Sequence, residues 1–177
     1  MNLFSYSNLH NFIWFQGIWF AAIFGGNQGL WLTLIAFAIV GHFFWVENWL
    51  QELKHILACC AVGLTVDTLL TLNHIFEFPE HATILPIPIW LIAIWIAFTG
   101  TLKHSLNYLV KKPILMTFLA GLTAPLSYIA AARVGVVNFP LGYLNTFLIV
   151  GASWMLMVPI FYWLQTHFDK NSNKTGN

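Results

Sequence analysis

Long apolar stretches with almost no charged residues alternate with short polar segments along the chain. A helix rises about 1.5 Å per residue, so about 20 apolar residues cross a hydrocarbon core that is about 30 Å thick. The runs are continuous rather than alternating, so we expect helices and not the strands of a barrel. The pattern predicts six helices: 11–24, 29–46, 53–76, the segment after Pro88 up to 110, the segment after Pro113 up to 132, and 140–167.

The predicted fold is therefore all-α, a polytopic integral membrane bundle of six transmembrane helices. We expect one domain over residues 1–168 and a disordered polar tail over residues 169–177, which read DKNSNKTGN. The first apolar stretch follows a segment without Lys or Arg, so it is expected to be a permanent helix rather than a signal peptide.

Basic residues in the short loops predict the orientation, because Lys and Arg concentrate on the cytoplasmic side of a membrane. One side holds only Arg133, whereas the other side holds most of the basic residues, so both termini are expected to be cytoplasmic and the protein to lie in a bacterial inner membrane. The residues on the cytoplasmic side are Lys54, Lys111, Lys112, Lys170 and Lys174.

Composition excludes several classes of protein. The chain is 59% hydrophobic and 7% charged, whereas a soluble domain carries about 25% charged residues. A net charge of +1 excludes strong electrostatic binding of nucleic acid. The adjacent Cys59 and Cys60 have no ligand-spaced partners beside them, so we expect neither a disulfide framework nor a metal site there, and no cofactor is predicted.

Two features of the apolar helices concern packing. Gly17, Ala21 and Gly25 form a stripe of small residues that lets another helix approach closely, from this chain or from another membrane protein. Residues 13–21 (IWFQGIWFA) and 89–97 (IWLIAIWIA) are similar, as an inverted repeat of three plus three helices would be, although chance similarity is the favoured interpretation.

Asp67 is the most informative polar residue, because a charge at the centre of a membrane helix costs about 2.5–3.5 kcal/mol on insertion scales. Asp67, Thr71 and His74 are spaced to share one helix face that points into the bundle. Tyr128 is expected at the depth of Asp67, and Arg133 is a candidate ion-pair partner for it. Two interpretations of Asp67 stay open: it belongs to a functional site, or it only forms a structural contact with a neighbouring helix.

His104 is the other polar candidate, and we expect it about 12 Å nearer the cytoplasm than Asp67. A proton-carrying role and a structural hydrogen bond are both open for it. His74, Glu77, Glu80 and His81 have no diagnostic ligand spacing, so a solvated loop is favoured over a metal site. For the deep Trp19, Trp95 and Trp154, packing is favoured over stacking on a ligand.

Four segments carry a family resemblance: FIWFQGIWFA, GLTVDTLL, TGTLKHSLNYL and APLSYIAAARVG. Together they resemble the bacterial inner-membrane family named domain of unknown function 2878, over nearly the whole chain. The chain departs from the family's pattern at Ala124 and Ala131, where the pattern has Gly. The resemblance implies six spans, and a gene neighbourhood with fatty-acyl-modifying methyltransferases hints at lipid chemistry.

The sequence contains no recognisable catalytic motif, so a non-enzymatic small-molecule binding or transport module around Asp67 is favoured. An enzyme, or an accessory subunit of one, acting on lipid or isoprenoid chains remains an alternative, with Asp67, His104 and Tyr128 in acid–base roles. A structural scaffold is the third possibility. Membrane lipids are the partners expected in every case.

Overall fold

The computed structural model describes residues 6–79 and 86–175, and these residues are folded almost entirely into helices. The only strand-like feature among them is an isolated antiparallel bridge between Glu77 and Asn138. The elements are α1 (Tyr6–Gly25), α2 (Gly29–Phe43), α3 (Trp49–Leu72), α4 (Ile89–Thr99), α5 (Asn107–Val110), α6 (Pro113–Val134) and α7 (Gly142–Thr175).

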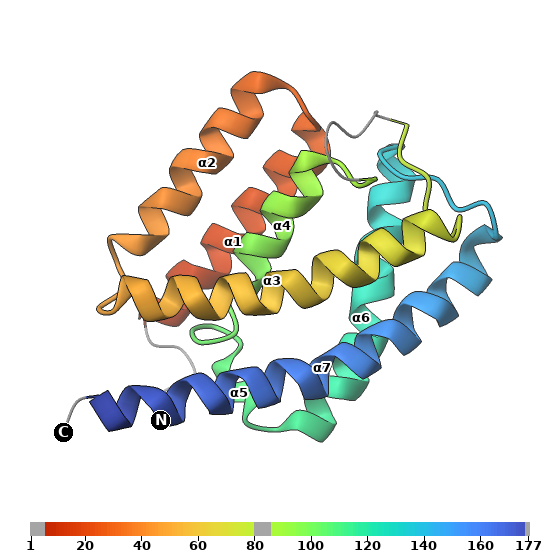
Figure 1. The fold of residues 1–177 in the computed structure, drawn as a ribbon. Coiled ribbons are helices and arrows are strands. Elements are labelled where there is room, and N and C mark those ends of the chain that lie inside the picture. Colours follow the sequence, from red (N-terminus) through yellow and green to blue (C-terminus); the bar gives the residue numbers. More distant parts are fainter. Residues whose placement is uncertain (1–5, 80–85, 176–177) are drawn as a thin grey trace.

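Helix α3 connects two groups of helices, because it packs against both α4 and α7. Figure 1 shows α1, α2 and α4 gathered on one side of α3 and α7 running along its other side. The most extensive helix contact joins α6 and α7. At that contact a Cβ added to Gly151 would lie 2.7 Å from the backbone oxygen of Gly121, so only glycine permits the approach.

The predicted helices are present, but the fourth is shorter than expected. The sequence predicts one helix up to 110, whereas α4 ends at Thr99 and turns over residues 100–106 separate it from α5. The helix breaks where Gly100 follows Thr99, whose hydroxyl bonds back to the carbonyls of Trp95 and Ile96. At the other end of the chain, α7 continues to Thr175, into the segment where a disordered tail is predicted.

The broken segment nevertheless follows α3 along its whole length in the opposite direction. Contacts pair Trp95 with Asp67, Thr99 with Cys60, and His104 with Glu52. Asn11 of α1 supports the break, since its amide donates to the Gly100 carbonyl and its Oδ1 accepts from Ser105. Non-helical backbone is tolerated at membrane depth where protein groups satisfy it in this way.

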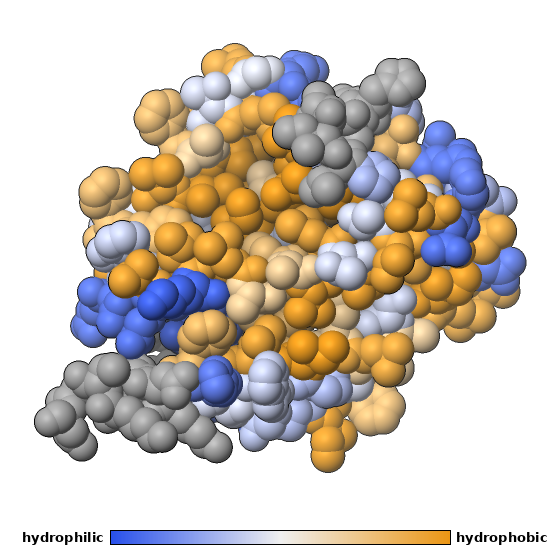
Figure 2. Space-filling model, in the orientation of Figure 1, coloured by the Kyte–Doolittle hydropathy of each residue, from blue (hydrophilic) through white to orange (hydrophobic). Residues whose placement is uncertain are grey.

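Three helices are long and apolar enough to cross a membrane: α3, α6 and residues 142–169 of α7. The apolar α2 and α4 are shorter, and α1 has the length but carries Asn8, His10, Asn11 and Gln16. Figure 2 shows hydrophobic residues over most of one face, with hydrophilic residues near the two ends of α3. The chain thus has the helices of a membrane protein.

The small-residue stripe on α1 meets different surroundings along its length. A Cβ at Gly25 would overlap the side chain of Trp31 on α2, so this end of the stripe lies against the same chain. Nothing lies within 4 Å of a Cβ at Gly17, which is exposed. The prediction that α1 binds another membrane protein stays a prediction.

Helix contacts do not follow the two-fold symmetry of an inverted repeat. Such a repeat would relate α1 to α4, α2 to α6, and α3 to α7, so contacts would occur in symmetric pairs. The α6–α7 contact is extensive, whereas its counterpart between α2 and α3 is not. The similarity between residues 13–21 and 89–97 therefore does not extend to the packing of the helices.

Candidate functional site

The Asp67 carboxylate lies inside the bundle, with 1% of the residue exposed, and two donors hold it. Trp95 Nε1 of α4 donates to Asp67 Oδ2 at 2.6 Å. The Tyr128 hydroxyl of α6 donates to the same carboxylate and lies 2.8 and 2.9 Å from its two oxygens. One acid on α3 thus joins α4 and α6, and these two bonds offset part of the cost of its burial.

Gly63 makes room for this arrangement one helical turn before Asp67. A Cβ at Gly63 would lie 2.3 Å from Trp95 Cζ3, well inside van der Waals contact. The indole therefore lies directly on the α3 backbone, and from there its N–H reaches the carboxylate. Gly63 and Asp67 form one unit, in which the first residue admits the ring and the second orients it.

Stacked rings fix the two donors from their other faces. The Trp95 ring stacks on Trp154 of α7 with centroids 5.3 Å apart and planes at 14°. The Tyr128 ring stacks on Phe76 at 4.8 Å and 9°. Each donor ring is therefore held both by a hydrogen bond and by an aromatic neighbour.

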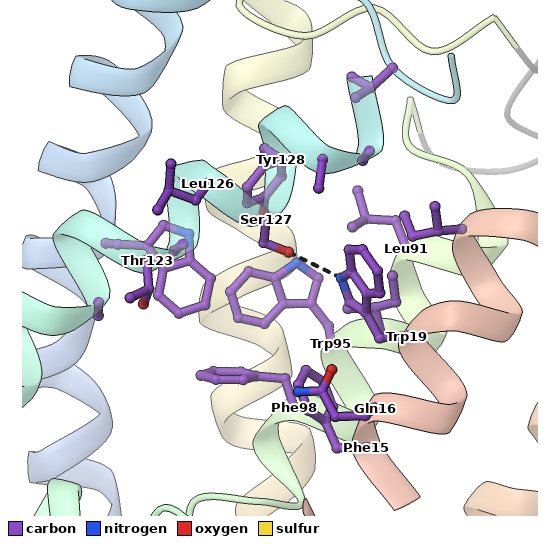
Figure 3. Close-up of a pocket in the computed structure, with 18 of the residues that line it drawn as sticks. Phe15, Gln16, Trp19, Leu91, Trp95, Phe98, Thr123, Leu126, Ser127 and Tyr128 are labelled. Atoms are coloured by element: carbon purple, nitrogen blue, oxygen red, sulfur yellow. Dashed lines mark hydrogen bonds between the residues drawn. The ribbon is translucent and has the colours of Figure 1, made fainter. Parts of the chain in front are cut away.

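A pocket of about 530 Å³ lies against these rings, between α1, α4 and α6 (Figure 3). Trp95 and Tyr128 line it, whereas Asp67 lies behind them and does not. The Trp19 indole of α1 donates to the Ser127 hydroxyl of α6 at 3.0 Å across the pocket. The other aromatic lining residues are Phe15, Phe78, Trp90, Phe98 and Trp154.

The lining is apolar apart from a few neutral groups. No Asp, Glu, Lys, Arg or His is among the lining residues that the structure describes. Gln16, Thr123 and Ser127 supply the polar side chains, and the Thr123 hydroxyl bonds to its own helix at the Leu119 carbonyl. The pocket is therefore a mostly hydrophobic cavity with few polar groups in its wall.

The structure separates the residues that the sequence groups around Asp67. Tyr128 bonds to the carboxylate, but the Thr71 hydroxyl bonds to the Asp67 backbone carbonyl instead. His74 is not on the predicted face, because α3 ends at Leu72 and His74 has a φ of 56°. It is exposed and lies 3.4 Å from Glu77.

Arg133 does not pair with Asp67. Its guanidinium lies over the Tyr143 ring at 5.2 Å, on an exposed surface, and no ion pair joins it to Asp67 among the described residues. The physical reason is that Trp95 and Tyr128 already occupy the carboxylate. A role for Arg133 in ligand binding stays a prediction.

His104 lies beside the start of α3, on the predicted side of Asp67 but farther from it than the predicted distance of about 12 Å. Its Nε2 is 3.0 Å from Glu52 Oε1, and Glu52 lies fifteen residues before Asp67, or about 22 Å along α3. The two sites therefore do not form one acid–base centre. Of the loop residues His74, Glu77, Glu80 and His81, the last two lie outside the described residues.

Sequence reasoning missed Trp95 as the partner of Asp67. A signal for it exists in the spacing of Gly63 and Asp67, because a glycine one turn from a buried acid can admit a large ring from another helix. Nothing in the sequence says which of several tryptophans fills that space. The pocket itself depends on three helices that are far apart in sequence, so it could not be predicted.

A model of one protein family, described as a protein of unknown function (DUF2878), matches residues 8–160. Comparison with curated proteins and with solved structures found no match. The matched region contains every residue of the Asp67 site and of the pocket, including Ala124 and Ala131 in the pocket wall. Since the match covers most of the sequence, the chain belongs to this family of unknown function.

Proposed function

We propose that the protein is a six-span protein of a bacterial inner membrane, with both termini cytoplasmic, that binds one small hydrophobic molecule between α1, α4 and α6. The observation that carries the binding function is the pocket of about 530 Å³ with aromatic walls. Pockets for small ligands are typically about 300–1,000 Å³ and mostly apolar. The Asp67 side chain is in this view a positioning residue that holds Trp95 and Tyr128 in the wall.

The exposed surface and the path of the chain support the topology. Large apolar side chains are exposed on α2, α6 and α7, among them Phe37, Phe118 and Leu156. In water such a surface would promote aggregation, whereas lipid tails cover it at no cost. The segment of α4 and its following turns runs the length of α3, which fits a fourth crossing despite the break at Gly100.

The lining supports a neutral ligand with a long or flat hydrophobic body, such as an isoprenoid or a fatty acyl chain. A charged group would find no partner among the lining residues that the structure describes. Gln16 and Ser127 offer the ligand one hydrogen-bonding end, and in Figure 3 both side chains face the pocket interior. A neutral lipid whose acyl or isoprenoid chain ends in a hydroxyl or carbonyl group satisfies both requirements.

An enzymatic role receives no comparable support. Asp67 is shielded from the pocket, and both of its oxygens already accept hydrogen bonds. A general acid or base has to reach the proton it transfers, directly or through one water molecule. Binding is therefore the function that this geometry supports best.

Native mass spectrometry of the full chain, extracted from its own membrane, tests the proposal. We expect one bound hydrophobic molecule per chain in the wild-type protein. In Ala124→Leu the larger side chain enters the pocket from α6, so the bound molecule should be lost. Ala152→Leu adds the same atoms at an exposed position of α7 outside the pocket lining, and should keep it.

Three results would overturn binding: a wild-type chain without any bound hydrophobic molecule, equal occupancy in the two variants, or a bound polar metabolite instead. A stable complex with a second protein and an empty pocket would favour the scaffold. Cysteine-accessibility labelling of residues 27 and 111 in intact cells tests the orientation separately. Only residue 27 should react from outside.

A further inference from the structure

Two histidines and a glutamate meet at the end of the bundle where α3 begins. His42 Nε2 lies 3.6 Å from Glu52 Oε1, and His104 Nε2 lies 3.0 Å from the same oxygen. The three potential ligand atoms all lie within 4.8 Å of one another. They come from the last turn of α2, the first turn of α3 and the turns after α4, so three separate elements direct them to one point.

The cluster is buried and incompletely satisfied. His42 is 8% exposed and Glu52 3%, yet His42 Nε2 has no hydrogen-bond partner within the described residues. A buried polar atom without a partner is rare in native proteins and calls for a missing water or ion. This nitrogen is directed at a carboxylate oxygen that a second imidazole also approaches.

Imidazole nitrogen and carboxylate oxygen are ligands that Zn²⁺ prefers, with bonds of about 2.0–2.1 Å. Two such ligands of a tetrahedral ion lie about 3.3 Å apart, and the two distances to Glu52 are 3.0 and 3.6 Å. We propose that His42, Glu52 and His104 bind one divalent transition-metal ion of the zinc type. The side chain of His104 is 30% exposed, so water can reach the fourth position.

Neighbouring residues hold the ligands in place, as is usual around metal sites. The Trp14 ring stacks on His42 with centroids 4.6 Å apart, and its indole N–H is fixed by the Ala38 carbonyl at 2.8 Å. Asn11 holds the turn that carries His104 through its bonds to Gly100 and Ser105.

Lys103 lies near the cluster, and its ammonium has a carboxylate partner on helix α7. Lys103 precedes His104 in sequence, but its ammonium lies 3.9 Å from Asp169 of α7. The positive charge is thereby partly neutralised by another carboxylate, and Glu52 remains available to a cation.

Metal titration of the full chain, purified in detergent and freed of metal with a chelator, tests the site. We expect Zn²⁺ to bind with one ion per chain, and Co²⁺ to show the intense visible bands of a tetrahedral complex. His42→Asn, Glu52→Gln and His104→Asn each remove a ligand. Each should weaken binding by more than about 100-fold, since loss of an outer-shell partner alone costs 10–100-fold.

The exposed pair at the other end of α3 provides the control. His74 and Glu77 lie 3.4 Å apart, and His74→Asn with Glu77→Gln should leave the affinity unchanged. His104→Cys addresses variants that fail to fold, because thiolate is also a zinc ligand; it should keep the ion and add a sulfur-to-cobalt charge-transfer band. Absence of stoichiometric Zn²⁺ binding, binding that survives loss of all three ligands, or a Cys variant without that band would overturn the proposal.

Discussion

Asp67 and Glu52 are two buried carboxylates on one helix, and their surroundings differ in a way that separates two uses of a buried acid. Asp67, in the last third of α3, accepts hydrogen bonds from an indole and a phenol, and among the described residues no ion pair joins it to a cationic group. Glu52, in the first turn, faces two imidazoles, and the Nε2 atom of one of them, His42, has no hydrogen-bond partner in the described part of the chain. The first acid is satisfied by neutral donors, whereas the second retains capacity for a ligand.

This difference shows that burial alone does not identify a binding residue. Asp67 is the more deeply placed acid and the more conspicuous one in the sequence, yet its bonds are complete. Its influence on the pocket is indirect, through the two rings that it orients. Glu52 is unremarkable in sequence, but its carboxylate and two imidazole nitrogens lie within 4.8 Å of one another.

Removing both hydrogen-bond donors from Asp67 should reduce the stability of the protein more than any other change described here. In Trp95→Phe with Tyr128→Phe the carboxylate is left buried without a partner, which costs about 3–5 kcal/mol of unfolding free energy. Steric trapping in lipid bicelles measures this free energy. Trp154→Phe with Tyr128→Phe is the matched control, because Trp95 still donates to Asp67.

A third substitution sharpens that result. Adding Asp67→Leu to the double variant removes the unpaired acid, so most of the lost stability should return. If the triple variant is no more stable than the double one, the loss came from cavities around the rings and not from the carboxylate.

Gly63→Ala should cause the next largest loss of stability, because the new methyl group would overlap the Trp95 ring. We expect a loss of about 1–3 kcal/mol, as for overpacked cores, together with a changed near-ultraviolet dichroism of the tryptophans. Gly17→Ala is the control, since nothing lies within 4 Å of a Cβ there. Equal effects at the two positions would show that Gly63 acts through helix propensity alone.

Tyr128→Phe by itself should be milder, at about 1 kcal/mol, because hydrogen bonds between membrane helices are individually weak. The Trp95 bond remains to hold the acid, and the ring still stacks on Phe76. The same unfolding measurement checks this, and a loss as large as in the double variant would mean that Trp95 contributes nothing.

Glu52→Leu in chelator should have the smallest effect, below about 1 kcal/mol, because the substitution also removes the cost of burying the Glu52 charge and leaves His104 able to bond to water. His104 is partly exposed and His42 Nε2 already lacks a partner. Added Zn²⁺ should then stabilise the wild-type chain but not this variant, because only the first binds the ion. Asp67→Asn should retain the response to Zn²⁺, which separates the two acids directly.

How far the sequence predicts this molecule depends on the range of the interactions involved. The apolar runs predict every long helix, since whether a segment forms such a helix depends mainly on the residues of that segment. The break at Gly100 was missed because Asn11, almost ninety residues earlier, satisfies backbone groups that a continuous helix would satisfy itself.

The candidate site shows the same limit. Helical rise places Tyr128 at the depth of Asp67, and the hydrogen bonds between them confirm that depth. Helical spacing also groups His74 with Asp67, and this is wrong because α3 ends at Leu72. His42, Glu52 and His104 converge only after three connections have been folded, and no spacing in the sequence records that convergence.

The hydrogen bonds that join Asn11 to Gly100 and Ser105 form a clamp on residues 100–105, and this clamp affects how the chain folds during synthesis. All parts of this clamp lie within the first 105 residues, so they are synthesised before α6 and α7. Domains tend to form in the order of synthesis. The amino-terminal helices can therefore pack against one another first, and the α6–α7 pair can then dock onto their surface.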